Sequence, residues 1–220
     1  MQDRSLFPWR APLSADWVER WSATDARVRA LAECSADAKT VDEVCIALRR
    51  LANEQLGPRE QLKLENLARR LVPVAHLLKP LRHFRIGLIG NRTLSFLVSP
   101  LRAAGLSRGL LIDVLEAPYD SARSFALGGV DVFGGEKLDA VVVLLDEGAF
   151  VRPAAMFDRA GEDAAIAEAV KFLKRIATAG RDSTGAGVVV ATMTPTAPLV
   201  SSADLATAGT LTRFVTGINA

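Results

Sequence analysis

Four short apolar runs punctuate the chain after residue 83, and stretches with helical periodicity separate them. The runs cover residues 84–90, 110–116, 138–145 and 187–192. Parallel strands are buried on both faces and need long crossover connections, so they appear in a sequence as continuous apolar runs. Hairpin turns, which an all-β fold would need, are missing between them. We therefore expect an α/β fold: a three-layer sandwich with a mostly parallel sheet covered by helices on both faces.

Before residue 84 the periodicity is helical, and we expect a helical arm over residues 1–83 ahead of an α/β domain over residues 84–220. The second helix of the arm gathers one apolar face: Val41, Val44, Cys45, Leu48 and Leu51. The third begins at Pro58, which suits a first helical position, and carries Leu62, Leu67 and Leu71. The next helix is expected over residues 93–104, closed by Gly105.

Charge is distributed unevenly along a chain whose net charge is only +2. Residues 49–92 hold ten basic residues against three acidic ones, a local charge of +7. The basic residues are Arg49, Arg50, Arg59, Lys63, Arg69, Arg70, Lys79, Arg82, Arg85 and Arg92. Aromatic residues are not interleaved with them, so nucleic acid is not an expected partner. The stretch is either a solvated surface or a docking face for an acidic partner.

The sequence fits neither a membrane span nor a secretory signal. The longest uninterrupted apolar run, residues 140–145, is far shorter than the roughly 18 residues of a span. The first ten residues lack a basic segment followed by an apolar one. Cys34 and Cys45 lack the spacing of a metal site and are predicted to be buried free thiols. We expect a soluble, cytoplasmic protein with no membrane partner and no bound metal.

Polar residues follow the apolar runs where the predicted strands end. In open α/β sheets, ligands bind off the carboxyl ends of the strands. Residues placed there are Gly90, Asn91, Arg92, Thr93, Glu116, Asp146 and Thr194. We expect one crevice to gather them as ligand-binding residues, although any strand must end in something polar.

The turn over residues 87–94 joins a predicted strand to a helix, so its amides are placed to hold an anion. It lacks the three-glycine fingerprint of dinucleotide sites, and no Walker lysine follows. No nucleotide cofactor is therefore expected.

Four stretches, residues 86–94, 101–106, 112–119 and 138–146, occur in an order and spacing that resembles the N-terminal domain of FkbH-like proteins. The resemblance implies a fold of the SGNH (GDSL) hydrolase type, related to flavodoxin. It also implies a role in polyketide and related natural-product assembly. There, a phosphatase-like domain of the haloacid dehalogenase (HAD) class loads a glyceryl unit onto an acyl carrier protein.

The phosphatase half of that system needs an Asp-x-Asp motif, and the segments at Asp131 and Asp146 both lack the second acid. The chain thus resembles the N-terminal part alone. The resemblance implies an acyl carrier protein and a HAD-type phosphatase domain as partners, and a phosphopantetheine thioester as the ligand.

An SGNH enzyme presents its serine nucleophile in a Gly-Asp-Ser block after the first strand. Here residues 90–92 are Gly-Asn-Arg, so Arg92 occupies the place of the serine. Thr93 is adjacent and Ser95 lies two residues further, neither at the matching position. Arg92 itself either binds a phosphate or carboxylate or pairs internally with Asp146 or Glu116.

The SGNH base is a histidine near the C-terminus, and this chain has none there. Its only histidines, His76 and His83, precede the predicted sheet. A missing base removes about 10²–10⁴ in rate from the proton transfer. We therefore expect a catalytically degenerate domain, not itself an enzyme, that recognises an acyl or glyceryl unit bound to a carrier protein.

Two alternatives stay open. The first is an active acyl-(thio)ester hydrolase or acyltransferase, with Thr93 or Ser95 as the nucleophile and Asp146 or Glu116 as an unusual base. The second is a protein–protein scaffold that acts through the helical arm.

Overall fold

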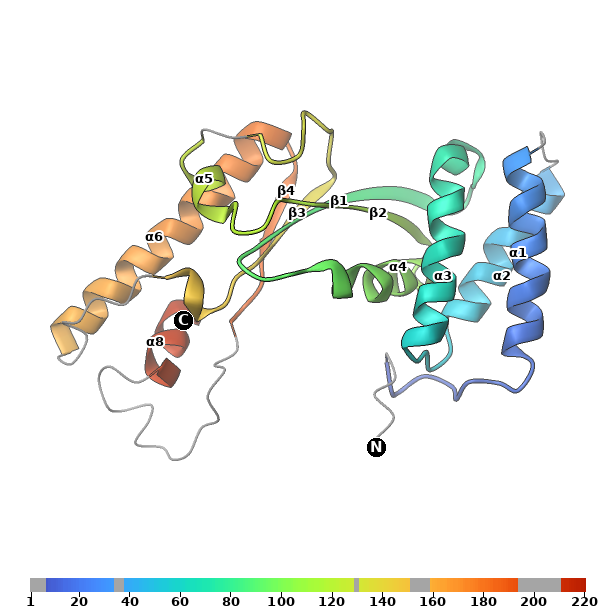
Figure 1. The fold of residues 1–220 in the computed structure, drawn as a ribbon, viewed down its shortest axis with the longest axis horizontal. Helices are drawn as coiled ribbons and strands as arrows, with labels where there is room; N and C mark the ends of the chain where they lie inside the picture. Colours follow the sequence, from blue (N-terminus) through green and yellow to red (C-terminus); the bar gives the residue numbers. More distant parts are fainter. Residues whose placement is uncertain (1–6, 34–37, 129–130, 151–158, 194–210) are drawn as a thin grey trace. The chain divides into compact units, whose positions relative to one another are not determined.

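A parallel four-stranded sheet organises the computed structural model, which describes residues 7–33, 38–128, 131–150, 159–193 and 211–220. The strand order is β2-β1-β3-β4 (Figure 1). The strands are β1 (Arg82–Gly90), β2 (Leu110–Glu116), β3 (Ala140–Leu144) and β4 (Gly187–Val190). Helices flank this sheet, so the expected three-layer α/β class is confirmed.

Seven α-helices are described. They are α1 (Trp17–Glu33), α2 (Ala38–Ala52), α3 (Pro58–Leu71), α4 (Val98–Ser107), α5 (Ala122–Ala126), α6 (Arg159–Thr184) and α8 (Leu211–Asn219). Short 3₁₀ helices cover Val72–Leu77, Ser95–Leu97 and Glu147–Ala149. None of the helices in the described ranges is long and apolar enough to cross a bilayer.

The register of the parallel pairs determines which residues leave the sheet together. Gly90 at the end of β1 lies beside Leu144 at the end of β3, and Val143 lies beside Val190 of β4. The order 2-1-3-4 is the beginning of the flavodoxin-like order, whose topological switch point lies between β1 and β3. A ligand crevice is therefore expected at the carboxyl ends of these two strands.

Contacts divide the chain into two compact units. Unit 1 comprises Met1–Arg85 and Ser95–Val114, and unit 2 comprises Ile86–Leu94 and Leu115–Ala220. Strands β1 and β2 contribute residues to both units. These units describe which residues pack together. They do not test the expected domains, residues 1–83 and 84–220, which remain a prediction.

In unit 1, helices α1 to α4 pack around one apolar core. The predicted face of α2 is buried, as expected. In α3 the prediction for Leu62 was wrong: it is 53% exposed, while Leu64 is buried. Steps of three and four residues from the buried Leu67 and Leu71 lead to Leu64, not to Leu62.

Helix α4 differs from the prediction at both ends. A 3₁₀ turn occupies Ser95–Leu97, and α4 then places Pro100 in its first turn, where a missing N–H costs nothing. Gly105 does not end the helix. A Cβ there would lie 2.5 Å from Cγ1 of Ile112, so glycine is needed for the close approach of the helix to β2. Gly109, with φ +77°, makes the turn instead.

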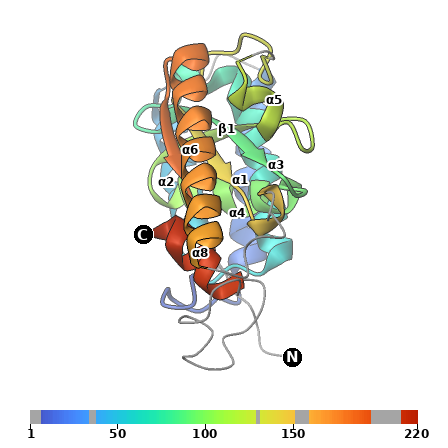
Figure 2. The ribbon, with the colours of Figure 1, turned by 90° about the vertical axis from the view of Figure 1, so that its left-hand side faces the viewer.

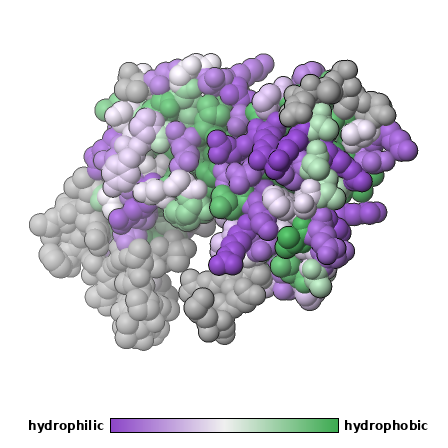
Figure 3. Space-filling view, turned by 45° about the vertical axis from the view of Figure 1, so that its right-hand side comes forward, coloured by the Kyte–Doolittle hydropathy of each residue, from purple (hydrophilic) through white to green (hydrophobic). Residues whose placement is uncertain are grey.

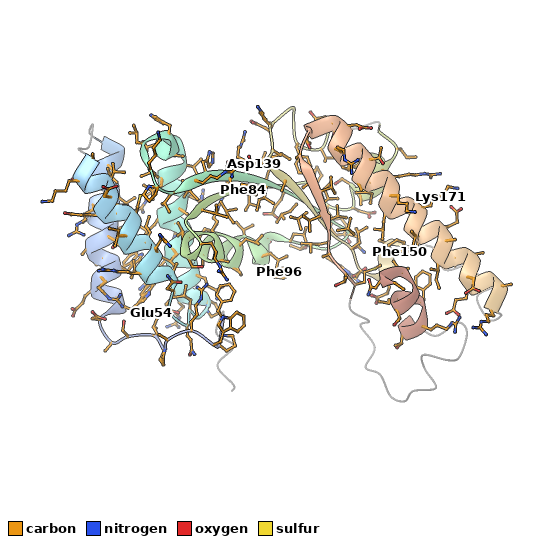
Figure 4. All side chains as sticks on the ribbon, turned by 180° about the vertical axis from the view of Figure 1, so that it is seen from behind. Glu54, Phe84, Phe96, Asp139, Phe150 and Lys171 are labelled. Carbon is orange, nitrogen blue, oxygen red and sulfur yellow. The ribbon has the colours of Figure 1, made fainter. Side chains whose placement is uncertain are left out.

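Two of the ion-pair networks in unit 1 join segments that lie far apart in the sequence. The buried Arg102 contacts Glu65 at 2.8 Å and Asp113 at 3.7 Å. Glu54, labelled in Figure 4, accepts hydrogen bonds from Arg20 and from the backbone and hydroxyl of Ser14. Neither network follows from local periodicity, because the partners lie far apart in the sequence.

The thiol of Cys45 is free and buried in unit 1, as predicted. Burial is the main cause that raises the pKa of this thiol. Cys34 lies outside the described residues.

In unit 2, the ends of the strands pack with α5, α6 and α8 around a second apolar core. Figures 1 and 2 show α8 beside α6. Phe150, labelled in Figure 4, joins them: its ring lies 6.0 Å from that of Phe172 in α6 and 6.3 Å from that of Phe214 in α8. This core supports the segment that follows β3.

Candidate ligand site at the ends of β1 and β3

The candidate site begins where β1 and β3 leave the sheet side by side in unit 2. Gly90 and Leu144 are the last paired residues. A Cβ at Gly90 would lie 2.7 Å from the carbonyl oxygen of Leu144, so glycine permits the two chains to approach closely. The residues that follow, Asn91 and Arg92 on one strand and Asp146 on the other, are brought together as a consequence.

Asp146 is the centre of this cluster. Its Oδ1 accepts hydrogen bonds from Nδ2 of Asn91 and from the backbone N–H of Gly148, the latter at 2.8 Å. Its Oδ2 accepts a hydrogen bond from Nε of Arg92. The backbone N–H of Asp146 in turn donates to Oδ1 of Asn91 at 3.0 Å. Asn91, which is only 8% exposed, thus joins the two strand ends reciprocally.

These contacts set the protonation of the pair. Burial by itself raises the pKa of Asp146, but hydrogen bonds from Arg92, Asn91 and the Gly148 amide, together with the Arg92 charge, hold that pKa below its usual value. The hydrogen bond to Asp146 is the main cause that raises the pKa of Arg92. Both groups are therefore charged at neutral pH. A carboxylate stabilised in this way is a weak general base.

Arg92 is internally paired, yet it stays open to solvent. Its side chain is 66% exposed, against 21% for that of Asp146. Only Nε bonds to Asp146, and in the described part of the chain no hydrogen bond engages the two terminal Nη groups. Gly148 permits the close approach of the Asp146 carboxylate, because a Cβ there would lie 3.0 Å from Oδ1 of Asp146. Asp146 thus orients a guanidinium whose outer donors face solvent.

The other predicted residues stand apart from this cluster. Thr93 is exposed in unit 2, and Ser95 is exposed and belongs to unit 1. Neither hydroxyl bonds to a carboxylate or an imidazole within the described ranges. Glu116 is exposed at the end of β2 and forms no ion pair with the described residues. Thr194 lies outside the described residues.

Unit 2 contains no histidine. The only two in the sequence are the exposed His76 and the half-buried His83, and both belong to unit 1. A search of the described residues also finds no group of three or more His, Cys, Asp or Glu side chains that could hold a metal ion.

Sequence reasoning missed the part played by Gly148. Asp146 is the N-cap of the 3₁₀ helix Glu147–Ala149, and its side chain accepts the Gly148 amide. The signal was present, since Asp followed two residues later by Gly after a strand is typical of such a cap. This local bond helps to orient the carboxylate that Arg92 contacts.

No family model and no curated protein matches the sequence. Among solved structures, the chain is similar to the N-terminal part of the protein BF1531 from Bacteroides fragilis, which contains a phosphatase domain and was crystallised in complex with Mg. The TM-score is 0.50 and the sequence identity 12%, over 63% of this chain and 36% of that chain. The present chain therefore spans about a third of the length of that crystallised chain, and the likeness shows a shared fold.

Proposed function

We propose that this chain is a catalytically silent recognition module of an FkbH-like biosynthetic system. It binds an acyl or glyceryl unit, carried by an acyl carrier protein, at the ends of β1 and β3. It presents that unit to a HAD-type phosphatase or glyceryl transferase domain. The observation that carries the proposal is the ion pair between Arg92 and Asp146 at the topological switch point.

Catalysis by the Thr93 hydroxyl would require a suitable base. A hydroxyl nucleophile needs a base whose pKa lies near the working pH. Asp146 has three hydrogen-bond donors and a lowered pKa, and unit 2 has no imidazole. Within the described residues the Thr93 hydroxyl bonds to no carboxylate or imidazole, which supports a binding role for the crevice.

The Nη donors of Arg92 are suited to an anionic ligand. An arginine held at Nε by a carboxylate keeps its Nη donors in a fixed orientation, suited to a carboxylate or a phosphate. The phosphate of a phosphopantetheine arm and an acidic acyl unit both meet this requirement. Because the pair exists before the ligand arrives, little side-chain entropy is lost on binding.

The structural likeness to part of a protein that contains a phosphatase domain gives loose support to the FkbH-like system. The SGNH-type fold, the carrier protein and the cytoplasmic location stay predictions from the sequence.

The proposal is tested with an acyl carrier protein loaded with an acyl-phosphopantetheine. We expect calorimetry to detect binding and intact-mass spectrometry to show an unchanged acyl group. Loss of a charge-assisted hydrogen bond in Arg92→Gln should weaken binding by about ten- to 150-fold, since such bonds contribute about 1.5–3 kcal/mol. Arg181→Gln, at an exposed arginine in α6, is the matched control and should bind normally.

Two results would contradict the proposal. Loss or transfer of the acyl group that disappears in Thr93→Ala or Ser95→Ala would establish an active hydrolase or acyltransferase. Equal binding of carrier proteins with and without the phosphopantetheine arm, unaffected by Arg92→Gln, would establish a scaffold.

A further inference from the structure

A groove runs between α1 and α2 in unit 1. Each helix contributes residues at positions i, i+3, i+4 and i+7, which lie on one face of a helix. Helix α1 contributes Arg20, Ala23, Thr24 and Arg27, and helix α2 contributes Glu43, Ile46, Ala47 and Arg50. With Leu51 they enclose about 540 Å³. At 1.5 Å per residue, the lined segments are about 10 Å long, or two helical turns.

The floor and wall of this groove are apolar. Leu51 and Thr24 are almost fully buried at its base, whereas Ile46 is 52% exposed. In the space-filling view, hydrophobic residues are scattered among hydrophilic ones over the visible face (Figure 3). An exposed apolar side chain is therefore no evidence of docking by itself. What distinguishes Ile46 is its place in a groove bounded by cations.

The cations lie at both ends of the groove. The indole N–H of Trp17, at the start of α1, donates to the carbonyl of Leu51, at the end of α2, so the two helices are antiparallel. Arg50 therefore lies at the end occupied by Arg20, and Arg27 lies toward the other end.

Nearby acids pair with Arg20 but leave Arg27 and Arg50 without an ion pair among the described residues. Asp25 pairs with Arg29 and with Arg70. Glu54 and Asp16 pair with Arg20. Arg27 and Arg50 are both exposed, and neither forms an ion pair with any residue in the described ranges. Glu43 is the single acid among the lining residues that are described, and in the antiparallel pair it lies toward the Arg27 end, so the positive charge is concentrated at the Arg50 end.

We propose that this groove binds an acidic amphipathic helix of a partner protein. The apolar face of that helix packs on Ile46, Ala47 and Leu51, and its carboxylates meet Arg27 and Arg50. This is helix-in-groove recognition, in which packing provides affinity and charge selects the partner and its register. The inference concerns unit 1 and does not depend on the crevice at Arg92.

The test uses a synthetic 18-residue peptide with leucines at i, i+3, i+4 and i+7 and glutamates on its other face. A fluorescent label reports its binding to the full chain by anisotropy. A scrambled peptide of the same composition has the charge without the apolar face. We expect the helical peptide to bind and the scrambled one to bind at least tenfold more weakly. Raising the salt from about 0.05 M to about 0.5 M should weaken binding by screening.

Neighbouring residues on α2 supply a matched pair for the charge. Arg50 lines the groove, whereas the equally exposed Arg49 does not. Arg50→Glu should weaken binding by about five- to tenfold, because an attraction becomes a repulsion. Arg49→Glu changes the net charge by the same amount and should alter binding less than twofold.

A second pair tests the apolar wall. Ile46 is 52% exposed in the groove, and Leu62 is 53% exposed on α3 outside it. We expect Ile46→Ser to weaken binding about fivefold and Leu62→Ser to leave it unchanged, since only the first side chain is covered by the peptide. Circular dichroism checks that all variants are folded.

Three results would overturn the inference. One is equal loss of binding in Arg49→Glu and Arg50→Glu, which would mean general electrostatic attraction. Another is tighter binding of a single-stranded oligonucleotide than of the peptide at the same groove, which would mean that the cations serve phosphates. The third is a dimer in sedimentation that Ile46→Ser dissociates, which would mean that a second copy of the chain occupies the groove.

Discussion

Arg102 in unit 1 and Arg92 in unit 2 both pair with carboxylates, but they differ in exposure. The side chain of Arg102 is 8% exposed and contacts Glu65 and Asp113. That of Arg92 is 66% exposed and contacts Asp146 through Nε. A buried pair must remain complete, because a lone charge in the interior is costly, whereas an exposed pair contributes little to stability. Burial, rather than pairing, therefore distinguishes a structural arginine from one that is available to a ligand.

The largest effect is expected at the buried arginine. Arg102→Ala leaves Glu65 without its cation and Asp113 paired with Arg85 alone among the described residues, so it should lower the free energy of unfolding by about 3–5 kcal/mol, measured by urea denaturation. Arg102→Met, which retains the apolar stem, should lose less. The exposed Arg108 is the control, and its change to Ala should have little effect. Equal stability of the Arg102→Ala and Arg108→Ala variants would contradict the view that burial makes Arg102 a structural residue.

The next largest loss of stability is expected at Gly90, where β1 and β3 approach each other closely and create the site. In Gly90→Ala, the new Cβ would meet the backbone carbonyl of Leu144 at 2.7 Å, so the strand ends must separate. We expect a loss of about 1–3 kcal/mol, typical of overpacking, in the same denaturation assay. Gly187→Ala in β4 meets nothing within 4 Å and should be tolerated. Wild-type stability in Gly90→Ala would show that the edge of unit 2 is looser than the core of unit 1.

A smaller effect is expected from pH. Because the pKa of Asp146 is lowered in the folded chain, its contribution to stability is present above the unfolded value of about 3.9 and is lost as the pH falls through the folded value. In unit 1, burial raises the pKa of Glu54, but hydrogen bonds from Arg20 and Ser14 lower it overall, so Glu54 has the same sign.

Unfolding free energies measured between about pH 6 and pH 2 test both carboxylates. Asp146→Asn and Glu54→Gln should each flatten the acid limb. The two effects should add, because the clusters share no partner. An unchanged slope in Asp146→Asn would mean that this carboxylate titrates alike in the folded and unfolded chain.

The smallest change in stability is expected at the exposed arginine. Arg92→Gln should leave the urea midpoint almost unchanged, because solvent replaces the lost bond. The pKa of Asp146 should nevertheless rise toward its usual value, which carboxyl chemical shifts in a pH titration would report. A destabilisation as large as that of Arg102→Ala would make Arg92 a structural residue and remove the main support for a ligand site.

Local patterns predicted much of the fold. The four apolar runs became four parallel strands, because such runs are typical of strands in a parallel sheet. Burial along them is uneven: the second half of β1 is buried, whereas β4 is largely exposed. The errors came from contacts between distant segments. Gly105 was expected to end a helix, but it lies under Ile112, and Leu62 was placed on a buried face that includes Leu64 instead. Neither position can be assigned until the neighbouring element is known.

The candidate site, like the fold, was predicted only in part from the sequence. The rule that polar residues at strand ends share one edge brought together Asn91, Arg92 and Asp146. It did not distinguish them from Thr93, which is exposed beside them, or from Glu116, which lies exposed at the end of β2. Strand ends share an edge, but side-chain pairing depends on which strands are neighbours.

By itself, then, the sequence determined the class of fold, the polar segment Asn91-Arg92 that follows the first strand and the lack of histidine after residue 83. Only the tertiary structure decided that Arg92 pairs with Asp146, 54 residues away. The physical reason is the separation along the chain over which each effect acts. Periodicity and residue chemistry act over a few neighbouring positions, whereas the pair exists because the register of β1 on β3 places Gly90 beside Leu144, so that the charged residues beyond them meet.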